Sequence, residues 1–401
     1  MRFTLFILRW EKFQRENWLS IWGLKRKRAL HSKGGYRYRV NSTANQNTLD
    51  FMARVRGEVS TELDKFLTEQ GQYLNSIGIE LDPVTNAIKS FLLDGGKRFR
   101  PLFAYVGYLA AGGPEDKSVL KAVSSLELLH ACALIHDDVM DGSDTRRNAP
   151  AIHKVFEGMH AADNLTGDSK SFGRSSAILL GDLALIWSDQ MLNQSNISIE
   201  ARIRSLTIHD EMRVELIAGQ YLDVLEQALA SKSVARSLKV ARYKSGKYSI
   251  ERPLHFGAAI ATADAKKYQA IFSNFGLPLG EAFQLRDDLL GVFGDPEETG
   301  KPAGDDLREG KRTALIAMTT ERANPLQLQV LDKYFGKADL DFAGVAKLRE
   351  LITNTGAVSD LEKLITELSD TAQKAIIHEA ITDEYQNLLT DLAIVATQRS
   401  Y

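Results

Sequence analysis

The stretch between Pro150 and Pro253 contains no proline, and this feature constrains the fold more than any other. Proline breaks a helix interior because it lacks a backbone N–H and its ring clashes with the preceding turn. Residues 204–229 carry apolar side chains at helical spacing, and the same pattern recurs over residues 368–396. Strand-type alternation of Val, Ile and Thr is scarce. The sequence therefore predicts an all-α fold, a single large bundle of long helices.

Length and composition favour one large folded domain. The chain has 401 residues, of which 44% are hydrophobic and 25% are charged. Its one cysteine, Cys132, excludes an internal disulfide framework and a Cys-based zinc site, so we expect a reducing, cytoplasmic setting. No uninterrupted apolar run reaches the length of a membrane-spanning helix, so none is expected.

Residues 1–50 differ from the rest of the chain. Residues 1–40 carry eleven Lys and Arg but only two Glu, whereas the remainder is acidic, so nucleic-acid binding by the folded domain is not expected. We predict that these residues are a disordered extension or result from a wrong choice of start. The alternative, suggested by their aromatic and basic residues, is an interfacial helix in peripheral membrane contact. We predict that the helical domain spans residues 51–401.

An apolar stretch, residues 130–141, ends in three carboxylates. On a helix, Asp137 and Asp141 lie on one face with Asp138 beside them. Like charges at this spacing repel, so a cation is expected to offset them. Carboxylate oxygens suit Mg²⁺, which completes its coordination with water and substrate phosphates. Alone, this motif also fits a solvated acidic helix end.

A second acidic cluster makes the metal interpretation stronger. Asp287 and Asp288 follow another apolar stretch, residues 272–283, about 150 residues after the first motif. Burying unpaired carboxylates is unfavourable, and a shared metal relieves the repulsion. Two such pairs on separate helices can face one another across a bundle. The sequence therefore predicts one metal site built from both motifs.

Cationic residues fall into two sets that suit two phosphate groups. Lysine provides a point charge for phosphate, and arginine binds its oxygens in a bidentate fork. Lys244 and Lys301 are expected near the phosphate on the metals, whereas Lys97 and Arg100 are expected to hold a second phosphate without metal.

Together these motifs resemble the trans-isoprenyl diphosphate synthases, and the resemblance is closest to actinobacterial-type geranylgeranyl diphosphate synthases. It covers the chain from about Met52 onward. Two departures are Gly291, where the family commonly has Asp, and a longer predicted loop over residues 156–173. The segments that carry the resemblance are GGKRFRP at 95–101, DDVMD at 137–141, Arg146-Arg147, Gln220 with Asp223, Lys244-Ser245, residues 284–288 and Gly300-Lys301.

The resemblance implies an isoprenoid synthase type I fold with a central cavity, Mg²⁺ dependence and homodimers. Asp137, Asp141 and Asp287 would bind three Mg²⁺, supported by Asp138 and Asp288, and Mn²⁺ would substitute. The allylic diphosphate would be bound by Arg146, Lys244, Ser245, Gln284 and Lys301. The catalytic set would be Asp137, Asp138, Asp141, Lys244, Gln284, Asp287, Asp288 and Lys301.

Isopentenyl diphosphate would be held by Lys97, Arg100, His130 and Arg147, and its double bond would attack the allylic cation in a 1'-4 head-to-tail condensation. The growing tail would lie in an apolar tunnel below the metals. Small residues there, Cys132 and Ala133, leave room, and Leu129 closes the tunnel one turn further on. We predict a C20 product, with dimethylallyl, geranyl and farnesyl diphosphates as starters.

Several alternatives stay open. The product could be farnesyl diphosphate or a chain of C25 or longer. A terpene cyclase would carry an Asn-Ser-Glu type second motif, which Asp287-Asp288 does not match. A non-catalytic regulatory subunit of a heteromeric synthase is expected to lose motif residues.

Overall fold

The computed structural model describes residues 44–295 and 304–398. Helices dominate these residues, and the strands among them form one hairpin with Thr145 opposite Pro150. The predicted all-α fold is confirmed. Lys301 and the expected membrane contact through residues 1–40 lie outside the described residues.

The elements follow one another in a mostly helical order. Those of the first half are α2 (Gln46–Ile77), η1 (Ile79–Leu81), α3 (Asp82–Leu93), α4 (Phe99–Ala110), α5 (Lys117–Asp141), β1 (Thr145–Arg146), β2 (Ala149–Pro150), α6 (Ile152–Ala162), α7 (Ser169–Asn193) and α8 (Ile199–Ala228). Those of the second half are α9 (Val234–Val240), η2 (Ala241–Glu251), α10 (Arg252–Ala261), α11 (Ala265–Phe293), α13 (Asp305–Glu309), α14 (Ala314–Arg322), α15 (Pro325–Tyr334), α16 (Phe342–Asn354), α17 (Ala357–Ala375) and α18 (Asp383–Thr397).

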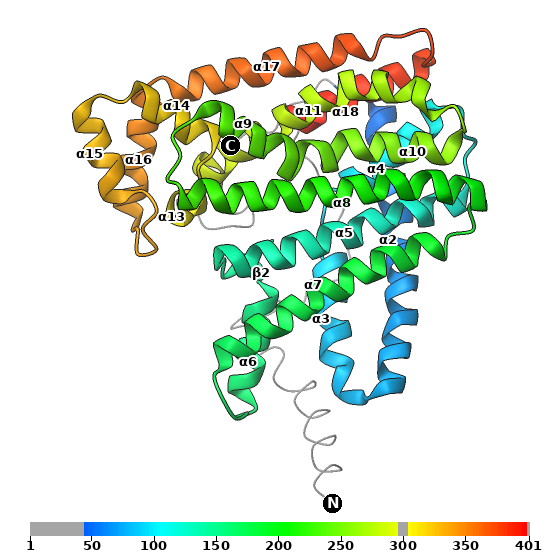
Figure 1. Ribbon diagram of the computed structural model, residues 1–401, viewed down its shortest axis with the longest axis horizontal. Coiled ribbons are helices and arrows are strands. Elements are labelled where there is room, and N and C mark those ends of the chain that lie inside the picture. Colours follow the sequence, from blue (N-terminus) through cyan, green and yellow to red (C-terminus); the bar gives the residue numbers. More distant parts are fainter. Residues whose placement is uncertain (1–43, 296–303, 399–401) are drawn as a thin grey trace, which may run out of the picture. The chain divides into compact units, whose positions relative to one another are not determined.

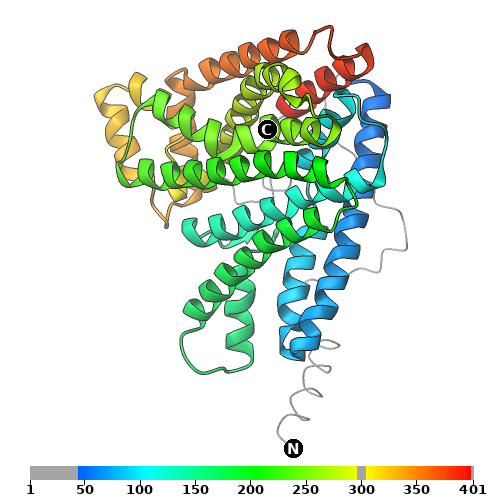
Figure 2. The same cartoon turned by 45° about the vertical axis from the view of Figure 1, so that its right-hand side comes forward.

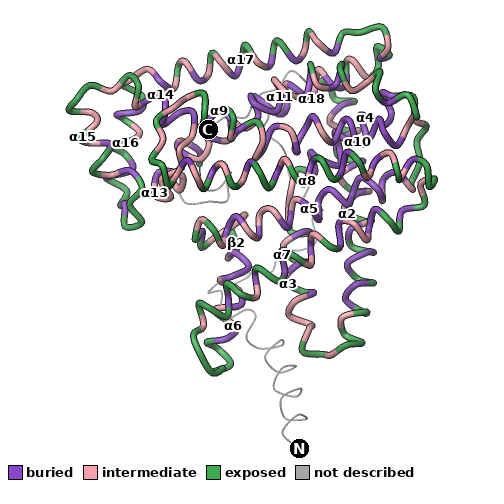
Figure 3. The backbone as a smooth tube through the Cα atoms, viewed as in Figure 1, coloured by how far each residue is buried: buried purple, intermediate pink, exposed green. Residues whose placement is uncertain are grey.

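Helix α4 forms the centre of the bundle. All of its residues are buried, and it packs against α10 and α5 (Figures 1 and 3). Around this centre, α5 lies along α7, α8 lies along η2, and α11 packs on both η2 and α17 (Figure 2). An apolar helix surrounded on all sides is the arrangement expected when no polar stripe is available to face water.

Helix α11 joins two hydrophobic cores. Its first part, with Phe272 and Phe275, belongs to the large core that includes α2 to α8. Its last part, with Leu285 and Leu289, belongs to a smaller core formed with α13 to α17. The second acidic motif therefore lies on the helix that connects the two cores.

Element η2 is a π-helix that continues directly from α9 and into α10. Such i→i+5 segments are rare and occur frequently at functional sites. It runs so close to α8 that a Cβ on Gly219 would collide with the backbone at Lys244. The close approach fixes the lysine of the Lys244-Ser245 motif against α8.

The folded region begins earlier than the predicted boundary at residue 51. Helix α2 starts at Gln46 because the Asn45 side chain accepts a hydrogen bond from the Asn47 N–H at 3.1 Å. The Thr48 hydroxyl then donates to Asp391 on α18 at 2.6 Å. Residues 45–50 are thus tied to the C-terminal helix.

The prediction of a loop over residues 156–173 is wrong. Residues 156–162 complete α6, and α7 begins at Ser169, where the Asp168 side chain accepts from the Ser171 N–H at 2.7 Å. The two helices approach closely, since a Cβ on Gly173 would collide with the His153 carbonyl. The periodic stretch 368–396 also divides into two helices, α17 and α18, rather than one.

Helix α5 is the one described helix long and apolar enough, by length and composition, to cross a membrane. However, 72% of its most apolar window is buried inside the protein. Burial to this extent is typical of a core helix. Its length matters here because it carries residues from Glu127 to Asp141 through the bundle centre.

The crossing of α4 and α10 provides a test of the packing. A Cβ on Gly257 would collide with the Ala104 carbonyl, so Gly257→Ala is expected to destabilise the protein by about 1–3 kcal/mol. The matched control is Gly57→Ala on the exposed face of α2, where a Cβ meets nothing within 4 Å. That change is expected to stabilise by up to about 1 kcal/mol. Urea unfolding measures both, and equal stability of the two variants would contradict the close crossing.

Candidate active site

The first acidic motif ends α5. The helix starts with the Asp116 carboxylate accepting from the Ser118 N–H at 2.8 Å and ends at Gly142, whose φ of 68° is readily adopted by glycine. Asp137 and Asp138 are both buried at this end. Arg146 lies on β1, after the end of α5. It donates to Asp138 from Nε at 2.9 Å and also from Nη2.

Asp137 accepts hydrogen bonds from two other elements. Its Oδ1 accepts from Lys244 Nζ on η2 at 3.0 Å and from Gln220 Nε2 on α8 at 3.0 Å. Lys244 also donates to Asp223 at 2.6 Å. Although burial alone would raise the pKa of Asp137, the charges of Lys244, Lys311 and Arg146 hold it far below its ordinary value. The carboxylate is therefore ionised.

Asp141 faces the segment that follows α11. Lys311 Nζ lies 3.0 Å from Asp141 Oδ2 and 3.0 Å from Glu309 Oε2. Glu309 is oriented by a hydrogen bond from the Ser143 hydroxyl at 2.6 Å. These contacts therefore hold the end of α5 and the coil after it against α13 and the coil after α13.

The second acidic motif lies near the end of α11. Gln284 Nε2 donates to Asp288 Oδ1 at 2.8 Å. Burial is the main cause that raises the pKa of Asp288 to about 8, and the negative charges of Asp306, Asp287 and Asp223 raise it further. The donation from Gln284 opposes this shift. Burial and the neighbouring carboxylates therefore both disfavour the ionised form of Asp288.

Gly291 marks where the motif departs from the family pattern. A Cβ on this residue would collide with the Asp306 carboxylate. Asp306 Oδ1 in turn lies 3.9 Å from Lys311 Nζ. The space that a side chain at 291 would need is thus filled by a carboxylate from α13.

The carboxylates fit a divalent cation. They supply hard oxygen ligands of the kind that Mg²⁺ prefers, and a bound cation would favour the ionised form of Asp288, which burial disfavours. Within residues 44–295 and 304–398, no three or more His, Cys, Asp or Glu side chains are grouped so that they could hold a metal ion. Instead the ammonium groups of Lys244 and Lys311 lie between the carboxylates.

A second polar cluster, formed mainly by arginines, lies further up α5. Arg100 Nη2 donates to the Tyr248 hydroxyl at 2.5 Å and to Ser249 Oγ at 2.7 Å. His130 Nδ1 lies 3.2 Å from the same Tyr248 oxygen. Burial first, and then the charges of Arg100, Arg147, Arg146 and Arg98, hold the pKa of His130 well below its ordinary value. The ring is therefore neutral beside four cations.

Glu127 is the anion that stabilises this cluster. Its Oε2 lies 2.6 Å from Arg98 Nη1, and both side chains are at most 3% exposed. Arg98 has a left-handed φ of 55° and also donates to the Leu92 carbonyl. Arg147, also at φ 55°, donates to the Phe91 carbonyl at 3.0 Å. The GGKRFRP segment is thus fixed to α5 by a buried ion pair.

The structure brings most of the predicted residues into these two clusters. Lys97 is exposed, with its ammonium 5.9 Å from the Phe99 ring centroid, and Ser245 is buried. Cys132 and Leu129 are buried, and burial raises the pKa of the Cys132 thiol to about 12. His136 fills the space beside Gly181, and its Nε2 lies 3.0 Å from the Ile178 carbonyl oxygen.

Sequence reasoning missed four contributors to these clusters, and it gave Lys311 no partner. The contacts of Lys311 come from chain folding that a motif does not reveal. The signal for Asp306 and Glu309 was the acidic content of the segment between Gly294 and Gly310. The remaining two are Glu127 and Tyr248. Glu127 lies three residues before His130 on α5, and Tyr248 lies four residues after Lys244 on η2.

Comparisons with known proteins agree with this arrangement. Residues 82–352 match the sequence model of the family described as polyprenyl synthetase. A crystal structure of geranylgeranyl pyrophosphate synthase from Corynebacterium glutamicum, complexed with isoprenyl diphosphate and magnesium, is 42% identical, with a TM-score of 0.83 over 86% of this chain and 99% of that one. This similarity supports a divalent metal cofactor.

Relatives with different products are also similar. Geranylfarnesyl diphosphate synthase of Aeropyrum pernix is 30% identical over 80% of this chain and 96% of its own length. Farnesyl diphosphate synthase of Geobacillus stearothermophilus is 32% identical over 64% of this chain and 84% of its own length. Similarity of this kind does not distinguish products.

The buried pair of Arg98 and Glu127 gives a stability prediction. Glu127→Gln leaves the Arg98 charge buried without its counterion, so we expect a loss of about 3–5 kcal/mol in urea unfolding. The control is Glu115→Gln, which removes an exposed contact to Arg54 and is expected to change stability by less than about 1 kcal/mol. If both variants lose equally little, the buried pair does not stabilise the segment.

Proposed function

The chain belongs to the polyprenyl synthetase family and is a prenyltransferase that elongates prenyl diphosphates, and we propose that its main product is geranylgeranyl diphosphate. In this proposal isopentenyl diphosphate condenses head-to-tail with dimethylallyl, geranyl or farnesyl diphosphate, and diphosphate is released. The observation that carries the proposal is the pair of clusters on α5. Carboxylates with Lys244 lie at its end, and an arginine cluster lies two turns before them.

The carboxylate end is proposed to hold the metals. Asp137, Asp141 and Asp287 would bind three Mg²⁺, with Asp138 and Asp288 in support and Mn²⁺ as a substitute. When bound, the metals supply positive charge that stabilises the departing diphosphate. Lys244 and Lys311 already lie 3.0 Å from Asp137 and Asp141, which supports a site built to balance charge between carboxylates and phosphate.

The allylic diphosphate is proposed to bind beside these carboxylates. Arg146, Lys244, Ser245, Gln284 and Lys301 would contact its oxygens. As the C–O bond breaks, the developing negative charge lies near fixed cations, which lowers the barrier. The amide dipole of Gln284, oriented by Asp288 at 2.8 Å, would face the allylic cation. Released diphosphate would accept the final proton, so no separate base is required.

Isopentenyl diphosphate is proposed to bind the second cluster through Lys97, Arg100, His130 and Arg147. The neutral state of His130 is supported by its lowered pKa, so the ring can donate one N–H to a phosphate oxygen. Tyr248 contacts both Arg100 and His130 and lies on the same π-helix as Lys244. One helix would therefore position groups for both substrates.

Homodimerisation and a cytoplasmic location complete the proposal. Exposed large apolar side chains on α7 and on α8 support the dimer, because such side chains are typical of protein interfaces when they gather on one face. The two helices are joined by Arg213 and Asp189 at 2.6 Å. The residues of this α7–α8 apolar surface, each at least 48% exposed, are Ile178, Leu179, Ile186, Ile203, Val214, Ile217 and Tyr221.

One assay tests the proposed reaction. Purified protein with Mg²⁺, isopentenyl diphosphate and each allylic diphosphate is expected to give C20 products after phosphatase treatment and chromatography. Asp137→Asn removes a proposed metal ligand and is expected to lower kcat at least 100-fold. No condensation with any starter would defeat the synthase proposal and favour a non-catalytic regulatory subunit. C15 or C25 products would correct the chain length alone.

The tunnel proposal predicts a product change. Cys132→Phe inserts a ring one turn before Asp137, so the main product is expected to shorten to C15. The control is Cys132→Ser, which keeps the size of the side chain and is expected to keep the product length. Unchanged chain length in Cys132→Phe, measured by chromatography, would reject Cys132 as part of the tunnel.

The dimer is tested by light scattering coupled to gel filtration. Ile217→Asp places a charge in the α7–α8 apolar surface and is expected to give a monomer at micromolar concentration. Phe342→Asp changes a side chain that is 82% exposed at the start of α16, and it is expected to leave the dimer intact. A monomeric wild type would reject the proposed dimer.

A further inference from the structure

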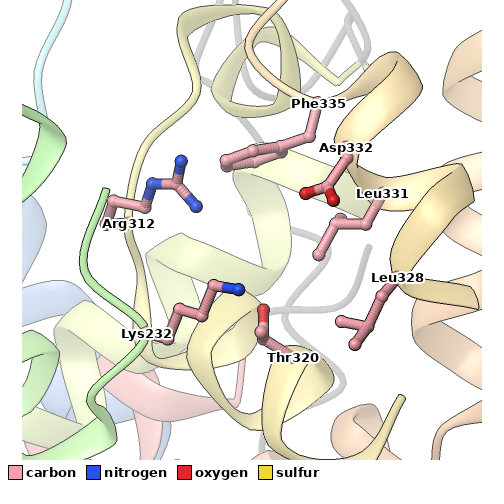
Figure 4. Close-up of a pocket in the computed structure, with 7 residues that line it drawn as sticks. All are labelled: Lys232, Arg312, Thr320, Leu328, Leu331, Asp332 and Phe335. Carbon is pink, nitrogen blue, oxygen red and sulfur yellow. The ribbon is translucent and has the colours of Figure 1, made fainter. Parts of the chain in front are cut away.

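A small cavity of about 100 Å³ lies among the connection from α8 to α9, α14 and α15 (Figure 4). None of the predicted site residues lines it. Its volume accommodates a few water molecules or one tetrahedral oxyanion, and is too small for a prenyl chain. The lining residues are Lys232, Arg312, Thr320, Leu328, Leu331, Asp332 and Phe335.

Two cations enter this cavity from one side. The guanidinium carbon of Arg312 lies 4.9 Å from the Phe335 ring centroid, and its Nε is buried without a hydrogen-bond partner among the described residues. A buried donor left unpaired is unfavourable, so the site favours a ligand that accepts from it. Lys232 is exposed at the cavity edge.

The cavity also contains hydrogen-bond acceptors. Figure 4 shows the Asp332 carboxylate pointing into the same space as the Arg312 guanidinium and the Lys232 ammonium. The Thr320 hydroxyl donates to the Ile316 carbonyl at 2.7 Å, so only its oxygen lone pairs can face a ligand. Leu328 and Leu331 close the remaining wall.

This mixture of groups selects among oxyanions. A fully deprotonated anion would meet Arg312 and Lys232 favourably but would be repelled by Asp332. A protonated oxyanion has oxygens that accept from the two cations and one O–H that can donate to the carboxylate. Phosphate carries such a proton near neutral pH, as phosphate monoesters partly do, whereas sulfate does not.

We propose that this cavity binds hydrogen phosphate, with Arg312 and Lys232 donating to its oxygens and Asp332 accepting from its O–H. The location is independent of the proposed condensation, but it is joined to the candidate active site through the chain. Arg312 follows Lys311, and the Ser237 hydroxyl donates to the Arg312 carbonyl at 2.7 Å. A ligand on Arg312 therefore binds one peptide bond away from the lysine that contacts Asp141.

The test is calorimetric titration of the full-length protein with inorganic phosphate and, separately, with sulfate, in metal-free buffer. Because the arginine cluster can also bind phosphate, the number of sites is measured as well as affinity. Lys232→Gln and Arg312→Gln are each expected to weaken one phosphate site at least tenfold. Lys239→Gln on α9, outside the cavity, is the control and is expected to leave every site unchanged.

Asp332→Asn is the discriminating variant. Removing the carboxylate ends the repulsion of sulfate, so sulfate is expected to bind this site at least tenfold more tightly. The preference of the site for phosphate over sulfate is expected to disappear. Lys232 and Asp332 are both exposed, so these variants test the site even if Arg312→Gln fails to fold. Wild-type titrations that are identical to those of Lys232→Gln and Asp332→Asn would overturn the proposal.

Discussion

The balance of charge between the carboxylates at the end of α5 and the ammonium groups of Lys244 and Lys311 is the interaction on which the site depends. Asp137 stays ionised although it is buried, because cations from three other segments surround it. Removing charge from water is costly unless partners compensate. Segments far apart in sequence, α5, η2 and the coil after α13, therefore meet at this point.

Much of this site follows from sequence because helix geometry is regular. Spacing along α5 predicts that Asp137 and Asp141 lie on one face, and the structure places each carboxylate beside a lysine at the end of this helix. What the sequence did not reveal depends on distant contacts. Lys311 reaches Asp141 across 170 positions of chain, and the Arg98–Glu127 pair requires two left-handed backbone turns nearby.

The fold shows the same division. An absence of proline and the helical apolar pattern predict helices correctly, since these are local properties. The residues before Phe51 and those between 156 and 173 were misjudged because local polarity outweighed capping signals. Asn45 and Asp168 each start a helix with one side-chain hydrogen bond. The π-helix over Ala241–Glu251 has no sequence signal that we recognise, although it positions Lys244 and Tyr248.

Gly291 has a consequence for how this chain can change over evolutionary time. The Asp306 carboxylate occupies the space that a side chain at 291 would take, so it has to move before a larger residue fits there. This carboxylate is the end of a flexible side chain, and we expect the effect of a substitution at 291 to depend on which residue stands at 306. The order in which changes at the two positions arise then affects the cost of each.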